Sequence, residues 1–391
     1  MNININQKDL KDAIEKLEKV LNKTSTTIPV INSVLIKAEN NEITITAYNL
    51  TSSLALNVDG EIIVPGTILI DKSNFKLIKK LSGILNITSI NNMGMKNINT
   101  EEEKEDIVSN TITIKANRNL KFNSILPEQF PELPQDINEE AFTIPENTFK
   151  NKLRIKAFVA KNHFRQVFNG VLILKDDIVA SNTHYMVRYK LNAENKCENQ
   201  LNIPIQSINE LDKILDNKNS NEIKFYYSKN ENNEMKYLKI QGKGYEYTTR
   251  LIEGMFPNYE QVIHQSSYTT INIEKRKLQD TLEFVMEIVK DDKFHPVIFG
   301  ITDQLEIHTP EYLEKSTSEI LPSEITGEEM KICFDSEYMN TILKTINEDK
   351  INIEFSGKLS PAVFKGENNE DEIYVLVPVR LREYEEDNVA V

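Results

Sequence analysis

Length, composition and charge exclude several classes of protein at the outset. The chain has 391 residues, 39% of them apolar and 27% charged, with a formal net charge of −14. This length exceeds what one hydrophobic core usually organises, so we expect three domains. No apolar run approaches the ~20 residues of a membrane-spanning helix, and the start of the chain lacks the basic and then apolar layout of a secretion signal. Cys197 and Cys333 lie far apart and suggest no disulfide framework, which favours a cytoplasmic protein.

The chain begins with a pattern of helices and strands. Residues 7–23 carry apolar side chains at helical spacing with lysines mostly outside the apolar stripe, which predicts an amphipathic helix. The next stretch alternates apolar and polar residues and breaks at Asn40 and Asn41, which indicates a pair of strands. Asp71 is placed to cap a second helix, and strands resume at Asn86 and again over residues 111–124.

The same order of helix, strands, helix and strands recurs twice more. Residues 145–162 predict the first helix of a second copy, and Ser207 and Glu210 have the spacing of a capping box at the start of its second helix. In the third copy the two helices begin at Glu274 and Asp335. The second helix thus returns about every 130 residues, which is typical of a repeat.

Three such copies predict an α+β fold in which each domain packs two helices on antiparallel sheets. The predicted domains span residues 1–126, 127–264 and 265–391, the last with a short acidic tail. Basic residues are relatively frequent in the predicted helices, mainly the first three, whereas the strands and loops are strongly acidic. Helices that face DNA would have this property. So would helices whose charged residues simply favour exposed faces, and the pattern leaves both interpretations open.

A strand near the C-terminus carries apolar residues on both of its faces. Val or Ile stands at every second position from Ile373 to Val379, and Tyr374 and Leu376 lie between them. Such a strand must be covered on both sides. Pro378 has no N–H to donate, so it lies at an edge or where pairing stops. The residues around Pro378 therefore form either a closing strand of the core or a margin that binds a partner.

This ending, YVLVPVRL from Tyr374 onward, joins three earlier stretches in resembling a known family. Those stretches are TIPVINS (27–33), Asn-Gly (169–170) followed by IVASNTHYM (178–186), and RLIEGMFPNYEQV (250–262). In this order they are similar to the bacterial sliding clamp, the beta subunit of DNA polymerase III.

The resemblance implies a head-to-tail homodimer whose six domains form a ring around double-stranded DNA, with helices lining the hole. The ring would tether the alpha subunit of DNA polymerase III, the clamp loader and other replication and repair proteins. It implies no catalytic role, no cofactor and no metal. Because encirclement retains DNA by topology, an acidic chain with lysines facing the hole is compatible with a DNA partner.

The resemblance also implies a pocket that binds partner peptides of the form Q-L-x-L-F. Carried over position by position, the pocket residues are Phe168, Ser181, Thr183, His184, Tyr185, Met186, Pro257, Val262, Leu359, Pro361, Val375, Leu376, Val377, Pro378, Val379, Arg380 and Leu381. Apolar walls with a few polar groups suit such anchors. The sequence departs from the family at residues 182–186, where NTHYM stands in place of a common D-G-H-R-L, and this changes the expected shape of the pocket.

Two further sets of residues are expected to face DNA and a partner subunit. The expected DNA-facing residues are Lys23, Lys79, Lys80, Lys150, Arg154, Lys156, Asn162 and Gln166. The family's loop arginine is absent, and Ser25 takes its place. The resemblance puts the subunit contact on Leu120, Phe122, Ile288 and Val289, four residues that would also suit ordinary core positions.

The sequence offers little chemistry for an enzyme. Its five histidines are scattered, and the motifs of zinc proteases, P-loop NTPases and α/β-hydrolases are absent. We therefore predict a non-catalytic DNA sliding clamp. Two alternatives from other classes stay open: an acidic scaffold protein without a DNA role, and a hydrolase that uses His184 beside Ser181.

Overall fold

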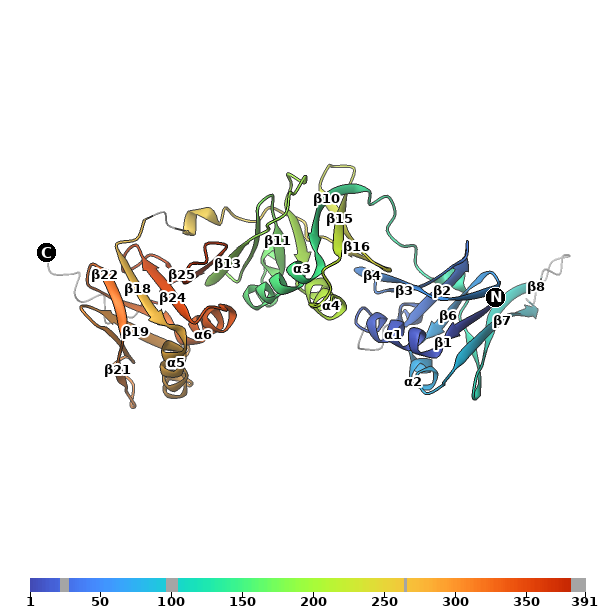
Figure 1. The fold of residues 1–391 in the computed structure, drawn as a ribbon, viewed down its shortest axis with the longest axis horizontal. Helices are drawn as coiled ribbons and strands as arrows, with labels where there is room; N and C mark the ends of the chain where they lie inside the picture. The colour runs from blue at the N-terminus through green and yellow to red at the C-terminus, as the bar shows by residue number, and fades with distance from the viewer. Residues whose placement is uncertain (22–27, 96–104, 264–265, 381–391) are drawn as a thin grey trace. The chain divides into compact units, whose positions relative to one another are not determined.

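The computed structural model describes residues 1–21, 28–95, 105–263 and 266–380 (Figure 1). Contacts between residues divide these into two compact units. The first unit contains residues 1–151, 193–197 and 206–251, and the second contains residues 152–192, 198–205 and those from 252 onward. Each unit combines two antiparallel sheets with the helices that pack beside them.

In the described residues of the first unit, the strands form a five-stranded and an eight-stranded sheet. The smaller sheet has the order β5 (Gly60–Val64), β1 (Asn2–Asn6), β7 (Ile84–Met95), β8 (Glu105–Lys115), β9 (Asn119–Ser124). The larger sheet has the order β10 (Glu139–Pro145), β15 (Glu222–Lys229), β16 (Met235–Gly242), β17 (Tyr245–Arg250), β4 (Ser52–Val58), β3 (Glu42–Tyr48), β2 (Ser33–Glu39), β6 (Gly66–Asp71). The helices of this part are α1 (Gln7–Leu17), α2 (Phe75–Ile78), α3 (Glu146–Lys152) and α4 (Ile205–Ile214), with short 3-10 turns η1 (Pro29–Asn32), η2 (Lys72–Asn74) and η3 (Pro127–Gln129).

The second unit has a nine-stranded and a four-stranded sheet over the part of the chain that the structure describes. The larger sheet has the order β14 (Leu201–Pro204), β11 (Gly170–Ile173), β12 (Asp177–Ser181), β13 (Tyr185–Lys190), β26 (Glu372–Leu376), β25 (Ala362–Gly366), β24 (Lys350–Phe355), β18 (Thr269–Glu274), β22 (Ser323–Gly327). The smaller has the order β21 (Ser318–Leu321), β20 (Leu305–His308), β19 (Pro296–Ile301), β23 (Met330–Asp335). The helices are α5 (Lys275–Val289) and α6 (Ser336–Thr345), with the 3-10 turns η4 (Leu153–Phe158), η5 (Gln166–Asn169) and η6 (Glu260–Val262).

Strands from successive predicted copies share a sheet within each unit. In the first unit β17 pairs with β4, and in the second β13 pairs with β26, both antiparallel. Each pairing joins residues more than 180 positions apart in the chain (Tyr247 with Leu54, Val187 with Tyr374). A continuous ladder of backbone hydrogen bonds thus crosses each junction between copies.

Several local predictions are confirmed in atomic detail. Asn40 and Asn41 have φ angles of 51° and 62° between β2 and β3, which suits the two-residue hairpin turn that Asn favours. The Asp71 side chain accepts a hydrogen bond from the Ser73 N–H at 2.8 Å. Asp335 does the same for the first turn of α6 and accepts from the Glu337 and Tyr338 N–H groups. Side chains that satisfy the free N–H groups of a first turn stabilise these helix starts.

Three predictions about helices are wrong. The first helix ends at Leu17 and not at residue 23. The helix expected over residues 145–162 is the short α3 followed by the 3-10 turn η4, so it ends at Phe158. The capping box is also wrong, because α4 begins at Ile205 and Ser207 and Glu210 lie inside it. Their side chains bind the sheet instead: Ser207 Oγ lies 2.7 Å from Thr249 Oγ1, and Glu210 accepts from Ser52 and Tyr247.

Candidate functional site

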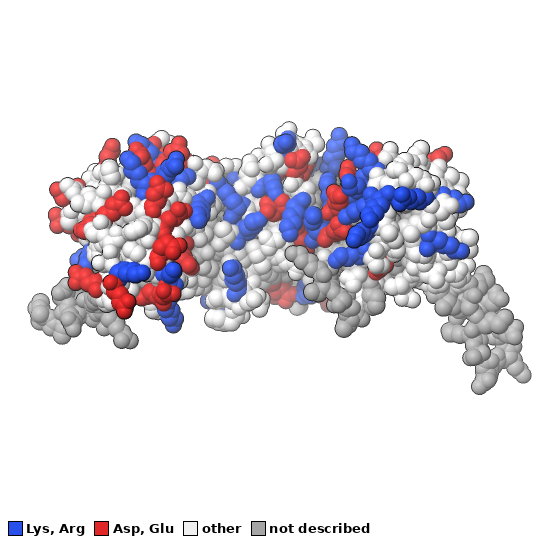
Figure 2. Space-filling view, turned by 90° about the horizontal axis from the view of Figure 1, so that it is seen from below, with Lys and Arg blue, Asp and Glu red and all other residues white. Residues whose placement is uncertain are grey.

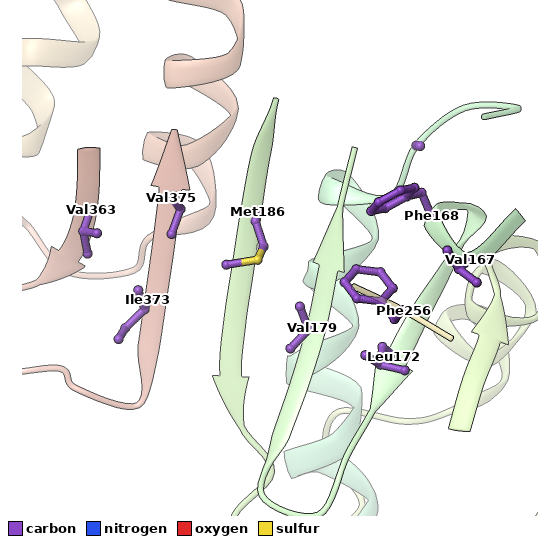
Figure 3. Close-up of a cluster of buried hydrophobic side chains, with 10 residues drawn as sticks. Val167, Phe168, Leu172, Val179, Met186, Phe256, Val363, Ile373 and Val375 are labelled. Atoms are coloured by element: carbon purple, nitrogen blue, oxygen red, sulfur yellow. The ribbon is translucent and has the colours of Figure 1, made fainter. Parts of the chain in front are cut away.

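An apolar cluster covers part of one face of the large sheet in the second unit (Figure 3). It consists of Ala160, Val167, Phe168, Leu172, Val179, Met186, Phe256, Val363, Ile373 and Val375, and we call these ten residues the apolar cluster. The side chains come from five neighbouring strands, β11, β12, β13, β26 and β25, and from the segments beside them (Figure 3). Met186 on β13 stands directly opposite Val375 on β26. The cluster therefore joins the two predicted copies that share this sheet.

Strand alternation divides the predicted pocket residues between two faces of this sheet. Met186 and Val375 belong to the apolar cluster, so their neighbours Tyr185 and Leu376 point the other way. On that second face the Tyr185 ring packs against Phe158, with 5.2 Å between ring centroids. Burial raises the pKa of the Tyr185 hydroxyl, which donates to the Ala157 carbonyl at 3.1 Å. Because side chains of β26 are buried on both faces of the sheet, this strand is apolar on both of its sides.

Several predicted pocket residues are exposed, and some of them lie close in sequence to members of the apolar cluster. Val262, Leu359 and Val377 are 40%, 66% and 41% exposed, whereas Phe168 and Met186 are buried. Thr183, His184, Pro257 and Arg380 are exposed, Pro361, Pro378 and Val379 are half-buried, and Leu381 lies outside the described residues. Exposed aliphatic side chains are the kind of surface that a peptide with apolar anchors requires.

Pairing of β26 stops at Leu376, as the position of Pro378 predicts. The Val377 N–H donates to the His184 carbonyl at 3.0 Å, and the Val379 N–H donates to the Cys333 carbonyl at 2.8 Å. Val379 also packs on Ile298 and Cys333 of the smaller sheet. The chain thus leaves one sheet and reaches the other across Pro378.

The turn between β12 and β13 holds the polar residues of the predicted pocket. Ser181 Oγ donates to the Tyr185 carbonyl at 3.1 Å and accepts from the Thr183 N–H at 3.0 Å. The His184 ring stacks on Tyr338 with 5.5 Å between centroids. Because the Ser181 hydroxyl proton is directed to a backbone carbonyl, Ser181 and His184 do not form the nucleophile and base pair of a hydrolase.

The residues predicted to face DNA have different environments. Lys80 is exposed, and Lys79 forms an ion pair with Glu18 at 2.7 Å. Lys150 pairs with Asp212 at 2.6 Å. Lys156 is half-buried, Asn162 and Gln166 are exposed, and Lys23 lies outside the described residues. Figure 2 shows Lys and Arg gathered on the face of the first unit that is seen from below in Figure 1.

Arg154 differs from the prediction that it faces DNA. Its guanidinium forms an ion pair with Glu372, donates to the Thr345 carbonyl at 3.1 Å, and lies over the Tyr189 ring at 5.2 Å. These partners lie on β26 (Glu372), α6 (Thr345) and β13 (Tyr189). The charge of Arg154 is therefore used inside the second unit. We therefore correct this assignment and omit Arg154 from the DNA-facing set.

The four residues predicted for a subunit contact lie in an edge strand and a helix. Leu120 and Phe122 are half-buried on β9, which ends the five-stranded sheet. Ile288 is half-buried on α5, but Val289 is completely buried in the core of its own unit and cannot contact a partner. Phe284, one helical turn before Ile288, is 61% exposed and was not among the predicted contact residues. Its spacing from Ile288 is the signal that could have found it.

Comparison with known proteins decides the family. The N-terminal, central and C-terminal domain models of the DNA polymerase III beta subunit match residues 1–134, 143–258 and 260–380. The chain belongs to the bacterial sliding-clamp family. The predicted family, the α+β clamp fold and the non-catalytic role of a clamp in the DNA polymerase holoenzyme are thereby confirmed, and the alternatives of a scaffold protein and a hydrolase are not favoured.

Individual clamps are only distantly similar to the chain. The beta sliding clamps of Staphylococcus aureus (strain Mu50) and Staphylococcus epidermidis (strain RP62A) are each 22% identical, and the S. aureus alignment covers 91% of this chain and 93% of that clamp. Among solved structures, the Bacillus subtilis sliding clamp has a TM-score of 0.81 at 21% identity, covering 97% of this chain and 99% of that one. The Pseudomonas aeruginosa beta subunit has a TM-score of 0.84 at 20% identity, with 97% and 100% covered.

The described residues contain neither a membrane-spanning helix nor a cluster of metal-binding side chains. No helix there is long and apolar enough to cross a membrane. No group of three or more His, Cys, Asp or Glu side chains in the same residues is arranged to hold a metal ion.

Proposed function

We propose that this clamp-family chain forms a head-to-tail homodimeric ring that encircles double-stranded DNA. The observation that carries the proposal is the edge strand β9, whose Leu120 and Phe122 remain half-buried with no further strand beside them in the described sheet. An edge of this kind favours pairing with another chain. The strand β21, with Ile320 59% exposed, ends the four-stranded sheet of the other unit and is a suitable partner.

The subunit of this ring would have three domains at residues 1–126, 127–264 and 265–391. The domain models that match 1–134, 143–258 and 260–380 support this division. DNA would be attracted by the exposed lysines of the helices, chiefly those near α1 and α2, and retained by the closed ring. The acidic remainder of the chain would disfavour DNA binding elsewhere. We propose the cytoplasm as the location of the protein.

Partner proteins would bind through a Q-L-x-L-F peptide at the apolar cluster and the exposed residues Val262, Leu359 and Val377. These partners would include the alpha subunit of DNA polymerase III and the clamp loader. The anchors of such a peptide are leucine and phenylalanine, and their burial would supply most of the binding free energy.

The decisive experiment combines sedimentation with retention on nicked circular DNA. We expect a species of twice the 45.1 kDa chain mass, loaded onto the circle by a clamp loader and lost when the circle is cut. A monomer that binds neither circular nor linear DNA would overturn the ring and would favour the acidic scaffold protein. Equal retention on circular and linear DNA would indicate ordinary DNA binding without encirclement.

A further inference from the structure

The segment Ile252–Ile263 crosses the apolar cluster with little regular structure of its own. Only η6 interrupts its irregular backbone. Phe256 is buried in the apolar cluster, edge-on to Phe168 with 5.2 Å between ring centroids. On either side of Phe256 the segment exposes apolar groups, because Met255 is 82% and Val262 is 40% exposed. The segment is therefore held on its inner side and offers an apolar outer side.

The first half of this segment is fixed by its backbone. The Ile252 N–H donates to the Asn202 carbonyl at 2.8 Å, and the Phe256 N–H donates to Gln200 Oε1 at 2.9 Å. Both acceptors lie in or beside the strand β14. These bonds and the Phe256 ring place the chain as far as Phe256.

The second half, which carries Val262, is tied to the sheet by a side-chain hydrogen bond of Tyr259. The Tyr259 hydroxyl donates to Asp177 Oδ2, at the start of β12, at 2.7 Å. The Tyr259 ring and Ile263 are partly buried against the apolar cluster. The Val262 and Ile263 N–H groups bond only to carbonyls within the segment, those of Tyr259 and Glu260. Tyr259 is thus the polar link between this half and the sheet.

The Asp177 carboxylate is itself held in place by two basic side chains of β13. Lys190 Nζ lies 3.0 Å from Asp177 Oδ1, and an Arg188 guanidinium nitrogen lies 3.7 Å from the same oxygen. The Asp177 side chain is only 14% exposed, so water competes weakly for these contacts. A hydroxyl that donates to an ionised, oriented carboxylate makes a stronger bond than one between neutral groups.

We propose that Tyr259 is a positioning residue that fixes the segment Ile252–Ile263 as one wall of the partner-peptide site. The inference rests on the proposed function, since it assumes that partner peptides bind at the apolar cluster. Without the bond to Asp177, Phe256 would still anchor the segment, but Val262 would have to be ordered when a peptide binds. The lost conformational freedom would then weaken binding.

The test is Tyr259→Phe, which removes the hydroxyl and leaves the ring in the cluster. We expect a fluorescent QLSLF peptide to bind roughly fivefold to tenfold more weakly. Amide hydrogen exchange should accelerate in residues 257–263 and stay unchanged in β12 and β13. Asp177→Asn keeps an oxygen that accepts the bond and should lose less affinity than Asp177→Ala.

Two further variants separate the possible causes. Tyr247→Phe removes another tyrosine hydroxyl that donates to a carboxylate at 2.7 Å, that of Glu210 in the first unit. It should lower stability and leave peptide affinity unchanged, so equal losses in Tyr247→Phe and Tyr259→Phe would overturn the proposal. Met186→Ala alters the proposed site directly. Weaker binding in Met186→Ala alone would overturn the role of Tyr259 and keep the site, whereas unchanged binding in both would overturn the site and the inference together.

Discussion

Thr183 keeps a backbone conformation that normally favours glycine. Its φ angle is 78° in the turn between β12 and β13, a region that β-branched residues rarely adopt. Short polar side chains stabilise the turn: Ser181 Oγ accepts from the Thr183 N–H, and Asn182 Oδ1 accepts from the Tyr185 N–H at 2.9 Å. Threonine thus has a left-handed backbone here, at the position where the family's common D-G-H-R-L has glycine.

Replacing Thr183 by Gly should stabilise the protein. The left-handed conformation costs an L-residue about 1–2 kcal/mol, and glycine relieves it, although part of this gain is lost to the greater freedom of glycine in the unfolded chain. We expect a net gain of about 1 kcal/mol, measured as a higher Tm. Thr326→Gly, in the strand β22 and exposed, is the matched control and should lower Tm. A lower Tm for Thr183→Gly would show that the turn carries no strain.

Glu210 is a buried acid whose protonation is coupled to folding. Burial raises its pKa above the ordinary 4.5, although hydrogen bonds from Ser52 at 2.5 Å, Tyr247 at 2.7 Å, Gln206 and Asn49 oppose the shift. Because the folded state holds this proton more tightly than the unfolded state, stability from this group falls as pH rises through the range above 4.5.

Glu210→Gln should remove this dependence. Glutamine keeps an oxygen that accepts from Ser52 and Tyr247 but does not ionise. The Tm of the variant minus that of the wild type should therefore increase as pH rises from about 4.5 to 8. Thermal melts in matched buffers measure the difference. A difference that decreases with pH would mean that the ionised carboxylate is the more stable form in the fold.

Elements whose signals are local were predictable from the sequence. The Asn40 and Asn41 turn and the Asp335 cap depend on nearest neighbours, so the pattern identified them. The capping box at Ser207 failed because its residues are drawn to partners far away in the chain, Thr249 and Ser52. The pairing of β17 with β4 and of β13 with β26 could not be predicted either, because no local sequence pattern specifies which distant strands pair.

The edge strand β9 allows a test of the proposed subunit contact. Phe122→Ala should weaken the dimer by about 2 kcal/mol, roughly 30-fold in Kd, because truncating an apolar group at an interface centre loses its burial. Sedimentation equilibrium measures the change. The control is Phe164→Ala, which removes a phenylalanine that is 84% exposed in the other unit and should leave the dimer unchanged. Undiminished affinity in Phe122→Ala would place the interface elsewhere.

For the molecule as a whole, the sequence predicted the chemistry of the candidate sites better than it predicted the burial and ion pairing of individual residues. The residues of the apolar cluster were partly named, through Phe168, Met186 and Val375. Burial and ion pairing could not be predicted from the sequence. Val289 is buried, which removes it from the proposed contact, and Arg154 pairs with Glu372. Lys79 and Lys150 also have acidic partners, so a count of basic residues overstates the charge available to DNA.

Lys76 and Lys80, the two exposed lysines in and just after α2, are therefore the residues with which to test DNA attraction. If this surface attracts duplex, Lys76→Glu with Lys80→Glu should slow loading onto nicked circles about tenfold at low salt, because like charges reduce the encounter rate. The defect should shrink at 1 M salt, where the screening length is ~3 Å, and the dimer should stay intact. Lys236→Glu with Lys243→Glu makes the same charge change on exposed residues of β16 and the turn after it. Equal slowing in both pairs would show that net charge alone governs loading, and that the helices of the first unit have no special access to DNA.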